Sequence, residues 1–383
     1  MLTPAGRGAV ATIRLRGSSE QIERAGFAPA ANLPLSEQPI RRLWFGFWGE
    51  TPSEEVVLGR LGKRDWELHC HGGYAAVARI LNSLRERGWD TSGWKEFFAQ
   101  DEPFPVVEHR EALALAATWK TTETLLRHTP QRFVEALNEL RTELDSTGWH
   151  DERSRSWVER WKQMLAWRSF GLHLTIPFRV ILAGQPNVGK SSLLNRLAGF
   201  ERAIVHDRPG TTRDIVRTLC AFEGWPFELS DTAGIRTHAE PLESLGIEKS
   251  LAEIAGADLV LFLVDVSRPP APAEEDCLQN CPRFLRIGHK ADLPVHSDRV
   301  LGDGTILVSS LNETGLEELI AAMIVLLVPE IPPVDSLIPI SIRQVEWLER
   351  LQSACEQNDP DSIRRCCEHL LNPDTVGEQH FFP

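Results

Sequence analysis

The amino-acid sequence predicts an α/β protein with a mostly parallel central sheet, accompanied by a helical domain and a small α+β domain at the N-terminus. Residues 177–330 alternate short apolar runs with helical segments, which is the pattern of strands joined by crossover helices. Helical periodicity precedes this block and returns after residue 336. The expected domains are 1–104 (α+β), 105–174 together with 336–383 (helical), and 175–335 (α/β with helices on both faces of the sheet).

Composition places few restrictions on function. The 383 residues are 42% hydrophobic and 25% charged, which is typical of a globular protein, and the net charge of −13 argues against a protein that coats nucleic acid or an anionic membrane. Seven scattered cysteines contain no CxxC pair. The longest apolar run, Leu319 to Val328, is too short to span a bilayer and suits a buried helix. We therefore expect a cytoplasmic protein with no membrane attachment.

The first hundred residues contain two clear strand patterns and one helix pattern. Strands are expected over 10–15 and 66–70, with a Pro-rich stretch of no clear periodicity, 26–40, between them. Residues 74–87 have apolar side chains at helical spacing, and Gly88 ends that helix. This combination indicates a small α+β unit.

The helical regions begin after an expected linker over 101–107, which is acidic and contains proline. From Glu108, apolar spacing through Leu126 indicates one helix, and Thr129 is expected to cap a second helix that starts at Pro130. A third helix carries four apolar side chains on one stripe, Trp157, Trp161, Met164 and Leu165. Tryptophan alternating with basic residues could form a nucleic-acid surface, but packing against neighbouring helices is the favoured interpretation. Two further helices are expected over 342–355 and 361–371.

The strands of the α/β block are expected over 178–183, 216–222, 226–230, 259–265, 284–287 and 305–309. The first of them runs into Gly184-Gln185-Pro186-Asn187-Val188-Gly189-Lys190-Ser191, which is followed by a helical segment beginning at Ser192. Strand, glycine-bounded loop and helix form the context of a phosphate-binding P-loop. The two glycines let backbone N–H groups curl around a phosphate, and the helix N-terminus adds its positive dipole. Lys190 is expected to reach the β- and γ-phosphates, and Ser191 to bind Mg²⁺.

Four further motifs follow in the order that a GTPase requires. Gly210-Thr211-Thr212-Arg213-Asp214 can supply a threonine hydroxyl, expected from Thr212, to Mg²⁺ when a γ-phosphate is present. Asp231-Thr232-Ala233-Gly234 follows a strand, so that Asp231 can hold Mg²⁺ through water and the Gly234 N–H can meet the γ-phosphate. His289-Lys290-Ala291-Asp292 and Ser309-Ser310-Leu311 follow the next strands. The Asp292 carboxylate suits guanine N1–H and N2–H₂, and a backbone N–H at 309–311 suits O6.

Single tetrapeptides of this kind are weak signals, but five in register at one edge of a sheet are strong evidence for guanine-nucleotide binding. One position departs from the pattern, because GTPases normally have Asn-Lys-x-Asp and residue 289 is histidine. We expect weaker affinity for the base, with guanine preference retained through Asp292. The residues expected at the nucleotide are Gly184, Asn187, Val188, Gly189, Lys190, Ser191, Ser192, His206, Thr211, Thr212, Asp231, Thr232, Ala233, Gly234, His289, Lys290, Asp292, Ser309, Ser310 and Leu311.

The segments GQPNVGKSSLLNRLAG, ERAIV, GTTRD, DTAGIR and LESLGIEKS together resemble the tRNA-modification GTPase MnmE (TrmE) family. The resemblance is close over 178–265 and thinner at the N-terminus, where Ala5-Gly6-Arg7-Gly8 and His71-Gly72-Gly73 carry it. It implies a GTPase domain inserted into a helical domain, a dimerising N-terminal domain that binds a tetrahydrofolate derivative, and action on the tRNA wobble uridine with a flavoprotein partner.

The same resemblance implies residue roles. A potassium ion replaces an arginine finger and is held by Asn187, the carbonyls of His206 and Arg208, and Thr211. A cation at that place offsets charge in the loose transition state. The catalytic glutamate matches Glu243, which would position the attacking water. Asn187 as a turn residue and Glu243 as a surface residue remain the alternatives.

Two departures limit what the resemblance implies. The C-terminal motif with a cysteine and a lysine has no match in residues 377–383. Arg14 and Glu67 match folate-contacting positions, but the partner lysines have no equivalent. Two hypotheses therefore stay open: a potassium-activated, homodimeric GTPase that acts in tRNA modification, and a diverged regulatory or assembly GTPase without that activity.

Overall fold

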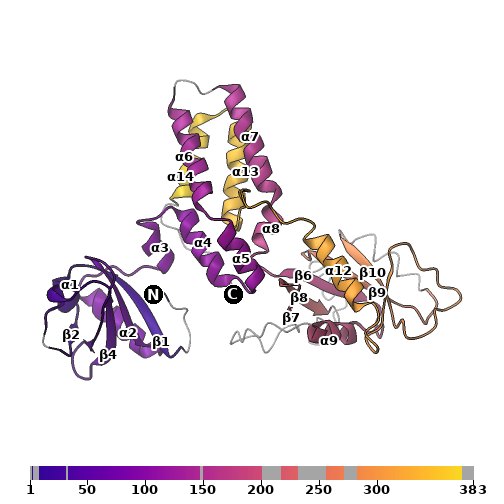
Figure 1. Ribbon diagram of the computed structural model, residues 1–383, viewed down its shortest axis with the longest axis horizontal. Coiled ribbons are helices and arrows are strands. Elements are labelled where there is room, and N and C mark those ends of the chain that lie inside the picture. The colour runs from indigo at the N-terminus through magenta and orange to yellow at the C-terminus, as the bar shows by residue number, and fades with distance from the viewer. Residues whose placement is uncertain are drawn as a thin grey trace, which may run out of the picture. The chain divides into compact units, whose positions relative to one another are not determined.

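The computed structural model describes residues 2, 8–31, 33–146, 150–200, 217–231, 256–270 and 283–372. The chain divides into two compact units, with the boundary in the sequence between Glu102 and Pro103 (Figure 1). The first unit holds the α+β part, and the second holds the helical part together with the α/β part. These parts reproduce the predicted fold class, which is confirmed.

The first unit is built on a five-stranded antiparallel sheet in the order β1-β5-β4-β3-β2. Its strands are β1 (Val10–Arg16), β2 (Phe27–Pro29), β3 (Leu43–Trp48), β4 (Glu54–Arg60) and β5 (Asp65–His71). The two predicted strands correspond to β1 and β5. We did not predict β2, β3 or β4. Apolar residues in β3 do not alternate with polar ones, so the two-residue periodicity that identifies a strand is absent from its sequence.

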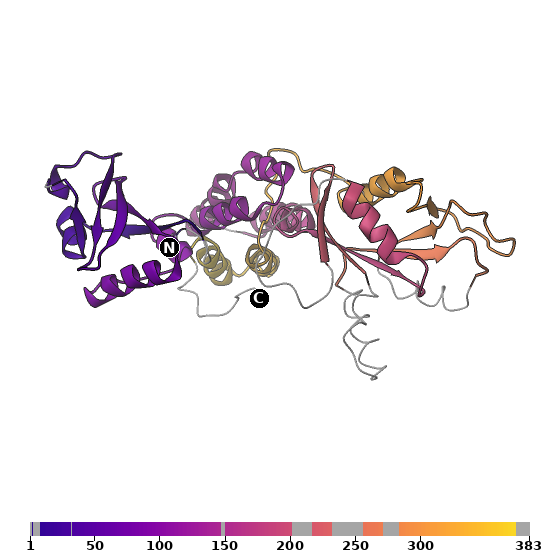
Figure 2. The ribbon, with the colours of Figure 1, turned by 90° about the horizontal axis from the view of Figure 1, so that it is seen from below.

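Helices pack on one face of this sheet (Figure 2). They are α1 (Ser19–Arg24) and α2 (Tyr74–Glu86), together with a 3-10 turn η1 (Leu35–Glu37). The unit also contains α3 (Trp94–Ala99), which has no buried residue. Ile22 of α1 and Ile80 and Leu84 of α2 are buried in the same core as Ile13 of β1 and Leu68 of β5. Alternate residues of each strand therefore supply the core, as expected for an antiparallel sheet with one covered face.

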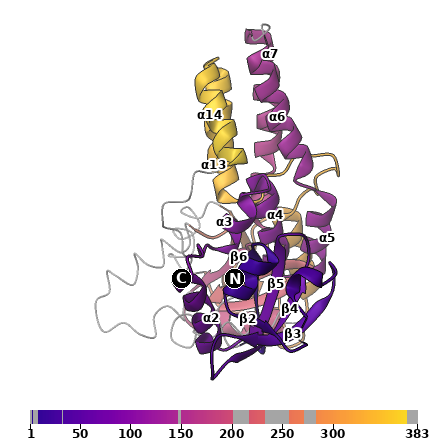
Figure 3. The same ribbon diagram turned by 90° about the vertical axis from the view of Figure 1, so that its left-hand side faces the viewer.

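The helical part of the second unit contains seven helices in its described residues. They are α4 (Phe104–Leu115), α5 (Trp119–Arg127), α6 (Gln131–Asp145), α7 (Asp151–Ala166), α8 (Arg168–Leu172), α13 (Ile342–Glu356) and α14 (Pro360–Leu371). The long helices α6, α7, α13 and α14 lie side by side (Figure 3). Trp161 is fully buried there and stacks on Trp157 at 5.3 Å, so the tryptophan stripe forms core and the packing interpretation is confirmed.

Three expectations about the start of this region are wrong. The expected linker 101–107 is helical from Phe104. Pro105 does not prevent this, because it lies in the first turn of α4, where a backbone N–H has no partner within the helix. The single helix expected from Glu108 is two helices, since Ala116 leaves helical geometry and Thr118 caps α5 by accepting from the Thr121 N–H. Thr129 does not cap α6, whose N-cap residue is Pro130.

Segments far apart in sequence are joined at the base of these helices by a buried polar cluster. The Glu108 carboxylate of α4 accepts two hydrogen bonds from the Arg343 guanidinium, at 2.9 and 2.7 Å, and one from Gln344 at 2.8 Å. Arg343 also donates to the carbonyl of His369 in α14 at 2.7 Å. Residues before the α/β block and residues after it are thereby tied together.

The α/β part is a six-stranded sheet in the order β11-β10-β9-β6-β8-β7, in which only β7 runs antiparallel to its neighbour. The strands are β6 (Phe178–Gly184), β7 (Arg217–Phe222), β8 (Trp225–Asp231), β9 (Leu259–Asp265), β10 (Phe284–His289) and β11 (Ile306–Val308), which confirms all six predicted strands. Helices α9 (Lys190–Phe200) and α12 (Leu316–Leu327) share one apolar core with one face of the sheet. Every residue of β9 is buried, as a central parallel strand requires.

Candidate functional site

Five parallel strands end at one edge of the α/β sheet. Because β6, β8, β9, β10 and β11 run in the same direction, the residues at their carboxyl ends meet at that edge. Strand β6 lies between β8 and β9, so that the strands that follow it in sequence are placed first on one side of it (β7 and β8) and then on the other (β9), which makes the end of β6 a topological switch point. Ligands of open α/β sheets bind in the crevice at such a point.

The loop from β6 to α9 has the backbone of an anion-binding turn. Gly184, Asn187 and Gly189 all have positive φ, at +142°, +62° and +103°. A Cβ on Gly184 would lie 2.5 Å from the Leu263 carbonyl oxygen, and one on Gly189 would lie 2.4 Å from the His289 ring. Glycine is therefore required at both ends of the loop, and alternation of right- and left-handed residues is the geometry that turns successive N–H groups to one side.

Lys190 is the first residue of α9 and is only 7% exposed. Its Nζ donates to the carbonyl oxygens of Gly184 and Gln185 at the start of the loop, both at 3.0 Å. The ammonium is thus held over the concave side of the loop rather than pointing into solvent. An anion bound in the loop would compete for the same donor.

The two side chains expected at Mg²⁺ lie together although they are forty positions apart in sequence. Ser191 Oγ donates to Asp231 Oδ2 at 2.6 Å, one from the start of α9 and the other from the end of β8. Asp231 is 6% exposed. A hydroxyl and a carboxylate oxygen are ligands that Mg²⁺ takes in nucleotide sites, usually with several waters.

The loops after β10 and β11 form the second half of the site. Ser309 Oγ donates to Asp292 Oδ1 at 2.5 Å, and the Leu311 N–H donates to Ser309 Oγ at 3.2 Å. Ser309 is fully buried, so it fixes the orientation of a more exposed Asp292 carboxylate. With Asp292 Oδ1 bonded to Ser309, the carboxylate can still accept hydrogen bonds from a ligand.

Lys290 connects this half to the phosphate loop. Its Nζ lies 2.6 Å from Asp265 Oδ2 and 3.3 Å from the Asn187 carbonyl oxygen. Burial alone would raise the pKa of Asp265, but hydrogen bonds from Lys290 and Ser267 outweigh it and hold that pKa below its usual value. Asp265 therefore stays ionised at neutral pH.

His289 is 3% exposed and lies between the two halves. Its Nδ1 is 2.8 Å from the Val188 carbonyl oxygen, and its Nε2 is 2.8 Å from Ser310 Oγ. Burial lowers the pKa of His289, so the ring is neutral at pH 7.

Sequence reasoning missed two residues of this site. Asp265 is the last residue of the fully buried strand β9, and a carboxylate directly after six apolar residues was a signal that could have found it. Arg196 of α9 donates from Nε to the Ser310 carbonyl oxygen at 3.0 Å and from Nη1 to Glu313 Oε1 at 2.7 Å. Nothing in the local sequence of Arg196 indicates that role.

Eight of the expected residues lie outside the described part of the chain: His206, Arg208, Thr211, Thr212, Thr232, Ala233, Gly234 and Glu243. The site as described therefore contains the phosphate loop, the Ser191–Asp231 pair and the base-facing loops.

The residues matched to folate positions lie in the first unit. Arg14 of β1 and Glu67 of β5 are directly opposite in the strand register, and Arg14 Nη1 lies 2.7 Å from Glu67 Oε1. Arg14 Nε is buried and has no hydrogen-bond partner among the described residues. The pair neutralises its own charge and keeps one donor for a further acceptor.

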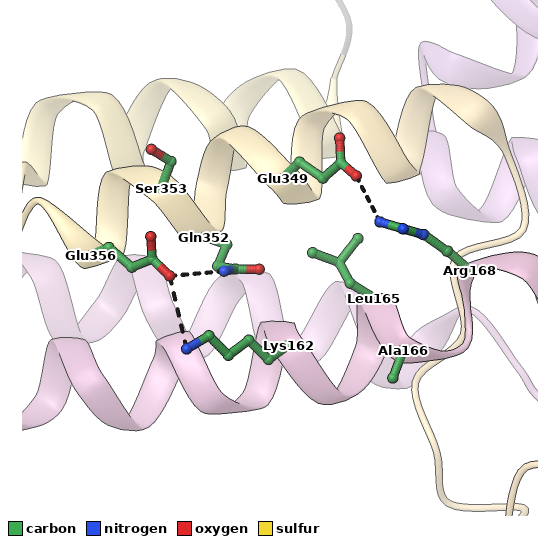
Figure 4. A pocket seen from close by; sticks show the side chains of 8 residues that line it. All are labelled: Lys162, Leu165, Ala166, Arg168, Glu349, Gln352, Ser353 and Glu356. Atoms are coloured by element: carbon green, nitrogen blue, oxygen red, sulfur yellow. Dashed lines mark hydrogen bonds and ion pairs between the residues drawn. The ribbon is translucent and has the colours of Figure 1, made fainter.

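A separate polar groove lies between α7 and α13 (Figure 4). Its cations and carboxylates are already paired, Arg168 with Glu349 at 3.1 Å and Lys162 with Glu356 at 3.9 Å. Its walls are Lys162, Leu165, Ala166, Arg168, Glu349, Gln352, Ser353 and Glu356. Opposite charges in equal number give the groove no preference for a charged ligand.

Comparison with known proteins identifies GTPases among the relatives of this chain. Residues 179–290 match the family model of the 50S ribosome-binding GTPase. The tRNA modification GTPase MnmE of Synechococcus sp. (strain WH7803) is 32% identical over 363 residues, covering 83% of this chain and 78% of that protein. The MnmE of Fervidobacterium nodosum is 29% identical, covering 91% of this chain and 84% of the relative. A solved structure of Aquifex aeolicus Era bound to GDP and AlF4⁻ is 28% identical over 46% of this chain and 66% of its own, with a TM-score of 0.31.

The fold and the site therefore define a P-loop GTPase, an enzyme that binds and hydrolyses GTP. Within that class, the chain belongs to the tRNA modification GTPase MnmE family, to which it is related over most of its length. Among the described residues, no helix is both long enough and apolar enough to cross a membrane.

Proposed function

We propose that the edge of the sheet at β6 binds guanine nucleotide with Mg²⁺, and that the described residues bind different parts of this ligand. The phosphate loop and Lys190 take the phosphates, Ser191 and Asp231 take Mg²⁺, and Asp292 takes guanine N1–H and N2–H₂. The observation that carries the proposal is the pairing of Ser191 with Asp231 directly beside the loop. A hydroxyl and a carboxylate held together beside Lys190 at the start of α9 are groups suited to Mg²⁺ and a phosphate.

Isothermal titration of the whole chain with GDP and with ADP, each with Mg²⁺, tests this site. We expect GDP to bind at least 100-fold more tightly, because adenine cannot pair its base edge with Asp292 and leaves that carboxylate without a donor. Lys190→Ala should abolish binding of both nucleotides. Equal affinity for GDP and ADP would contradict the guanine assignment.

We propose further that K⁺ is bound beside the phosphates by Asn187 and by the carbonyls of His206 and Arg208 with Thr211, that Thr212 joins the Mg²⁺ shell, and that Glu243 positions water. Asn187 supports this, since it is exposed on the loop at positive φ. K⁺ would supply positive charge near the leaving oxygen of the β-phosphate. The remaining residues of this proposal rest on the family resemblance.

The rate of GTP hydrolysis in KCl compared with NaCl tests the proposed K⁺ site. The same rate in Glu243→Ala tests the proposed role of Glu243 in positioning water. We expect turnover to fall at least tenfold in NaCl and at least 100-fold in the variant, while GDP affinity is unchanged. Glu248→Ala is the matched control five positions further on. Turnover that is indifferent to both changes would contradict both assignments.

For the chain as a whole we propose three domains, 1–104, 105–174 with 336–383, and 175–335, and a homodimer that acts on tRNA wobble uridine with a flavoprotein partner. Membership in the MnmE family supports this. A tetrahydrofolate derivative would meet Arg14 and Glu67, whose unpartnered Arg14 Nε offers a donor. Bound folate would supply a one-carbon unit.

A GTPase that switches or assembles without modifying tRNA is the second candidate. The Arg14–Glu67 pair favours it, because each charge is already neutralised by the other. Nucleoside analysis of wobble uridines after deletion of the gene and complementation distinguishes the two. Restoration of the modified uridine by this chain supports the first candidate, and failure with normal GTP turnover supports the second.

A further inference from the structure

The histidine at position 289 has both ring nitrogens occupied by the protein. Nδ1 faces the carbonyl oxygen of Val188 in the phosphate loop, and Nε2 faces the hydroxyl of Ser310 in the loop after β11, each at 2.8 Å. The ring also lies directly on Gly189, where an added Cβ would come within 2.4 Å of it. One side chain therefore touches two segments that are proposed to bind the nucleotide, the phosphate loop and the loop after β11.

These contacts determine the tautomer. A carbonyl oxygen can only accept, so Nδ1 must carry the proton that it donates to Val188. A neutral imidazole then has only a lone pair on Nε2, which accepts from the Ser310 hydroxyl. Burial keeps the ring neutral. His289 consequently has no N–H left for a ligand.

The position of the base follows from its neighbours. If Asp292 binds guanine N1–H and N2–H₂ and a backbone N–H of 309–311 binds O6, the next atom along the base edge is N7. Because His289 forms a hydrogen bond with Ser310 in that loop, its side chain is the one expected beside N7. Guanine N7 is an acceptor, and Nε2 offers it no donor.

We infer that His289 is a positioning residue that ties the phosphate loop to the base loop and gives no hydrogen bond to guanine N7, so that this chain recognises guanine through O6, N1 and N2 alone. This inference rests on the proposed guanine-nucleotide function. It differs from recognition by an asparagine, whose amide can accept and donate at the same time and so can serve a loop and N7 together.

The experiment compares GDP with 7-deaza-GDP, in which N7 is replaced by C–H and the rest of the base is kept. For the unsubstituted chain we expect dissociation constants within twofold of each other by isothermal titration at pH 7.5. His289→Asn restores an amide donor, so 7-deaza-GDP should bind about 2- to 12-fold more weakly than GDP, the factor that one neutral hydrogen bond is worth. The measurement on the unsubstituted chain needs no variant to fold.

Three results would overturn the inference. The first is an affinity of the unsubstituted chain for 7-deaza-GDP that is at least fivefold weaker than for GDP, because a protein group would then donate to N7. The second is an unchanged ratio in a folded His289→Asn, because residue 289 then does not face N7. The third comes from ¹⁵N-resolved NMR of the ring: Nε2–H in place of Nδ1–H would contradict the tautomer. His289→Asn identifies the signal among the twelve histidines.

Titration with ADP separates this inference from the proposed function. Failure to prefer GDP over ADP refutes guanine recognition itself. A strong preference for GDP together with sensitivity to N7 refutes only the role assigned to His289. His289→Ala tests the positioning role. Loss of the contacts with Val188 and Ser310 should weaken the binding of GDP and of 7-deaza-GDP by the same factor, about tenfold. Different factors for the two nucleotides would contradict a role in positioning.

Discussion

At the scale of single residues, the site depends on side chains that orient one another before any ligand binds. Ser309 holds Asp292, Asp265 holds Lys290, and His289 connects Val188 with Ser310. Preorganised groups lose less conformational entropy on binding than free ones. The residues that a nucleotide would touch are therefore supported by residues that it would not touch.

Asp265 is the clearest example of such support. Asp265→Asn keeps the shape of the side chain but removes the charge that faces Lys290, which is about one quarter exposed. We expect a loss of about 1–3 kcal/mol in the free energy of unfolding, less than for a fully buried pair because solvent partly screens Lys290. Urea unfolding without nucleotide measures it. Asp298→Asn, at a carboxylate 72% exposed, is the control and should change stability by less than about 0.5 kcal/mol.

Buried histidines determine how stability depends on pH. Burial lowers the pKa of His109 and of His289, whose rings donate or accept within the protein, below the unfolded value of about 6.5. Below that pH the unfolded chain binds more protons than the folded chain, so stability is complete above about pH 6.5 and falls as pH drops. We expect each histidine to contribute up to about 1 kcal/mol to this loss by pH 5.5.

Urea unfolding of the unsubstituted chain and of His109→Gln at pH 5.5 and 7.5 checks this prediction. The difference in stability between the two pH values should be smaller in His109→Gln, although the variant is less stable at both. An identical pH dependence would show that His109 titrates normally.

At the scale of elements, the hairpin of β7 and β8 connects the α/β sheet to the helical part. Its tight turn uses Glu223 and Gly224 at φ of 48° and 83°, as two-residue hairpins require. Lys120 of α5 donates to the Glu223 carbonyl oxygen at 3.1 Å, and Trp225 packs edge-on against Phe170 of α8 at 5.5 Å. The other ends of β7 and β8 lead toward the segments expected to sense the γ-phosphate. The hairpin is thus in a position to couple the two parts.

Trp225 is 2% exposed and belongs to the core that both parts share. Trp225→Ala should lower the free energy of unfolding by about 3–5 kcal/mol, because it removes a large buried ring and leaves a cavity. Trp119→Ala is the matched control on α5, since that ring is 76% exposed and should cost less than about 0.5 kcal/mol. Chemical denaturation followed by circular dichroism compares them. Similar losses in both variants would show that Trp225 does not join the two parts.

At the scale of the whole molecule, the chain consists of two compact units with separate cores. Among the residues that the structure describes, the core of the first unit, which includes Trp48 and Trp66, shares no residue with the cores of the second. A ligand that binds only the folded form stabilises the unit that holds its site, by about 2.7 kcal/mol at 100 times its dissociation constant. The two units should therefore respond differently to nucleotide.

Differential scanning calorimetry of the full chain with and without GDP tests this expectation. We expect at least two transitions, of which one moves to higher temperature with GDP and Mg²⁺ while the other stays. ADP serves as the control nucleotide and should move neither. A single transition that moves as a whole would mean that the two units unfold together, in contradiction to their separate cores.

Much of this architecture could be predicted from local sequence. The six strands of the α/β sheet, the helices α7, α13 and α14, and the phosphate loop all follow from apolar periodicity and from glycine positions, which depend on near neighbours. The strands β3 and β4 and the break between α4 and α5 could not be predicted, because long-range pairing and capping determine them.

Within the site, the sequence by itself identified the motifs and their order, since each motif is a contiguous string with its own chemistry. Only the tertiary structure decided how they cooperate. Asp265 meets Lys290, Arg196 meets Ser310, and His289 contacts both Val188 and Ser310, across separations of 21 to 114 residues. Such contacts arise because parallel strands deliver distant segments to one edge of the sheet, and no periodicity along the chain records which side chains will meet there.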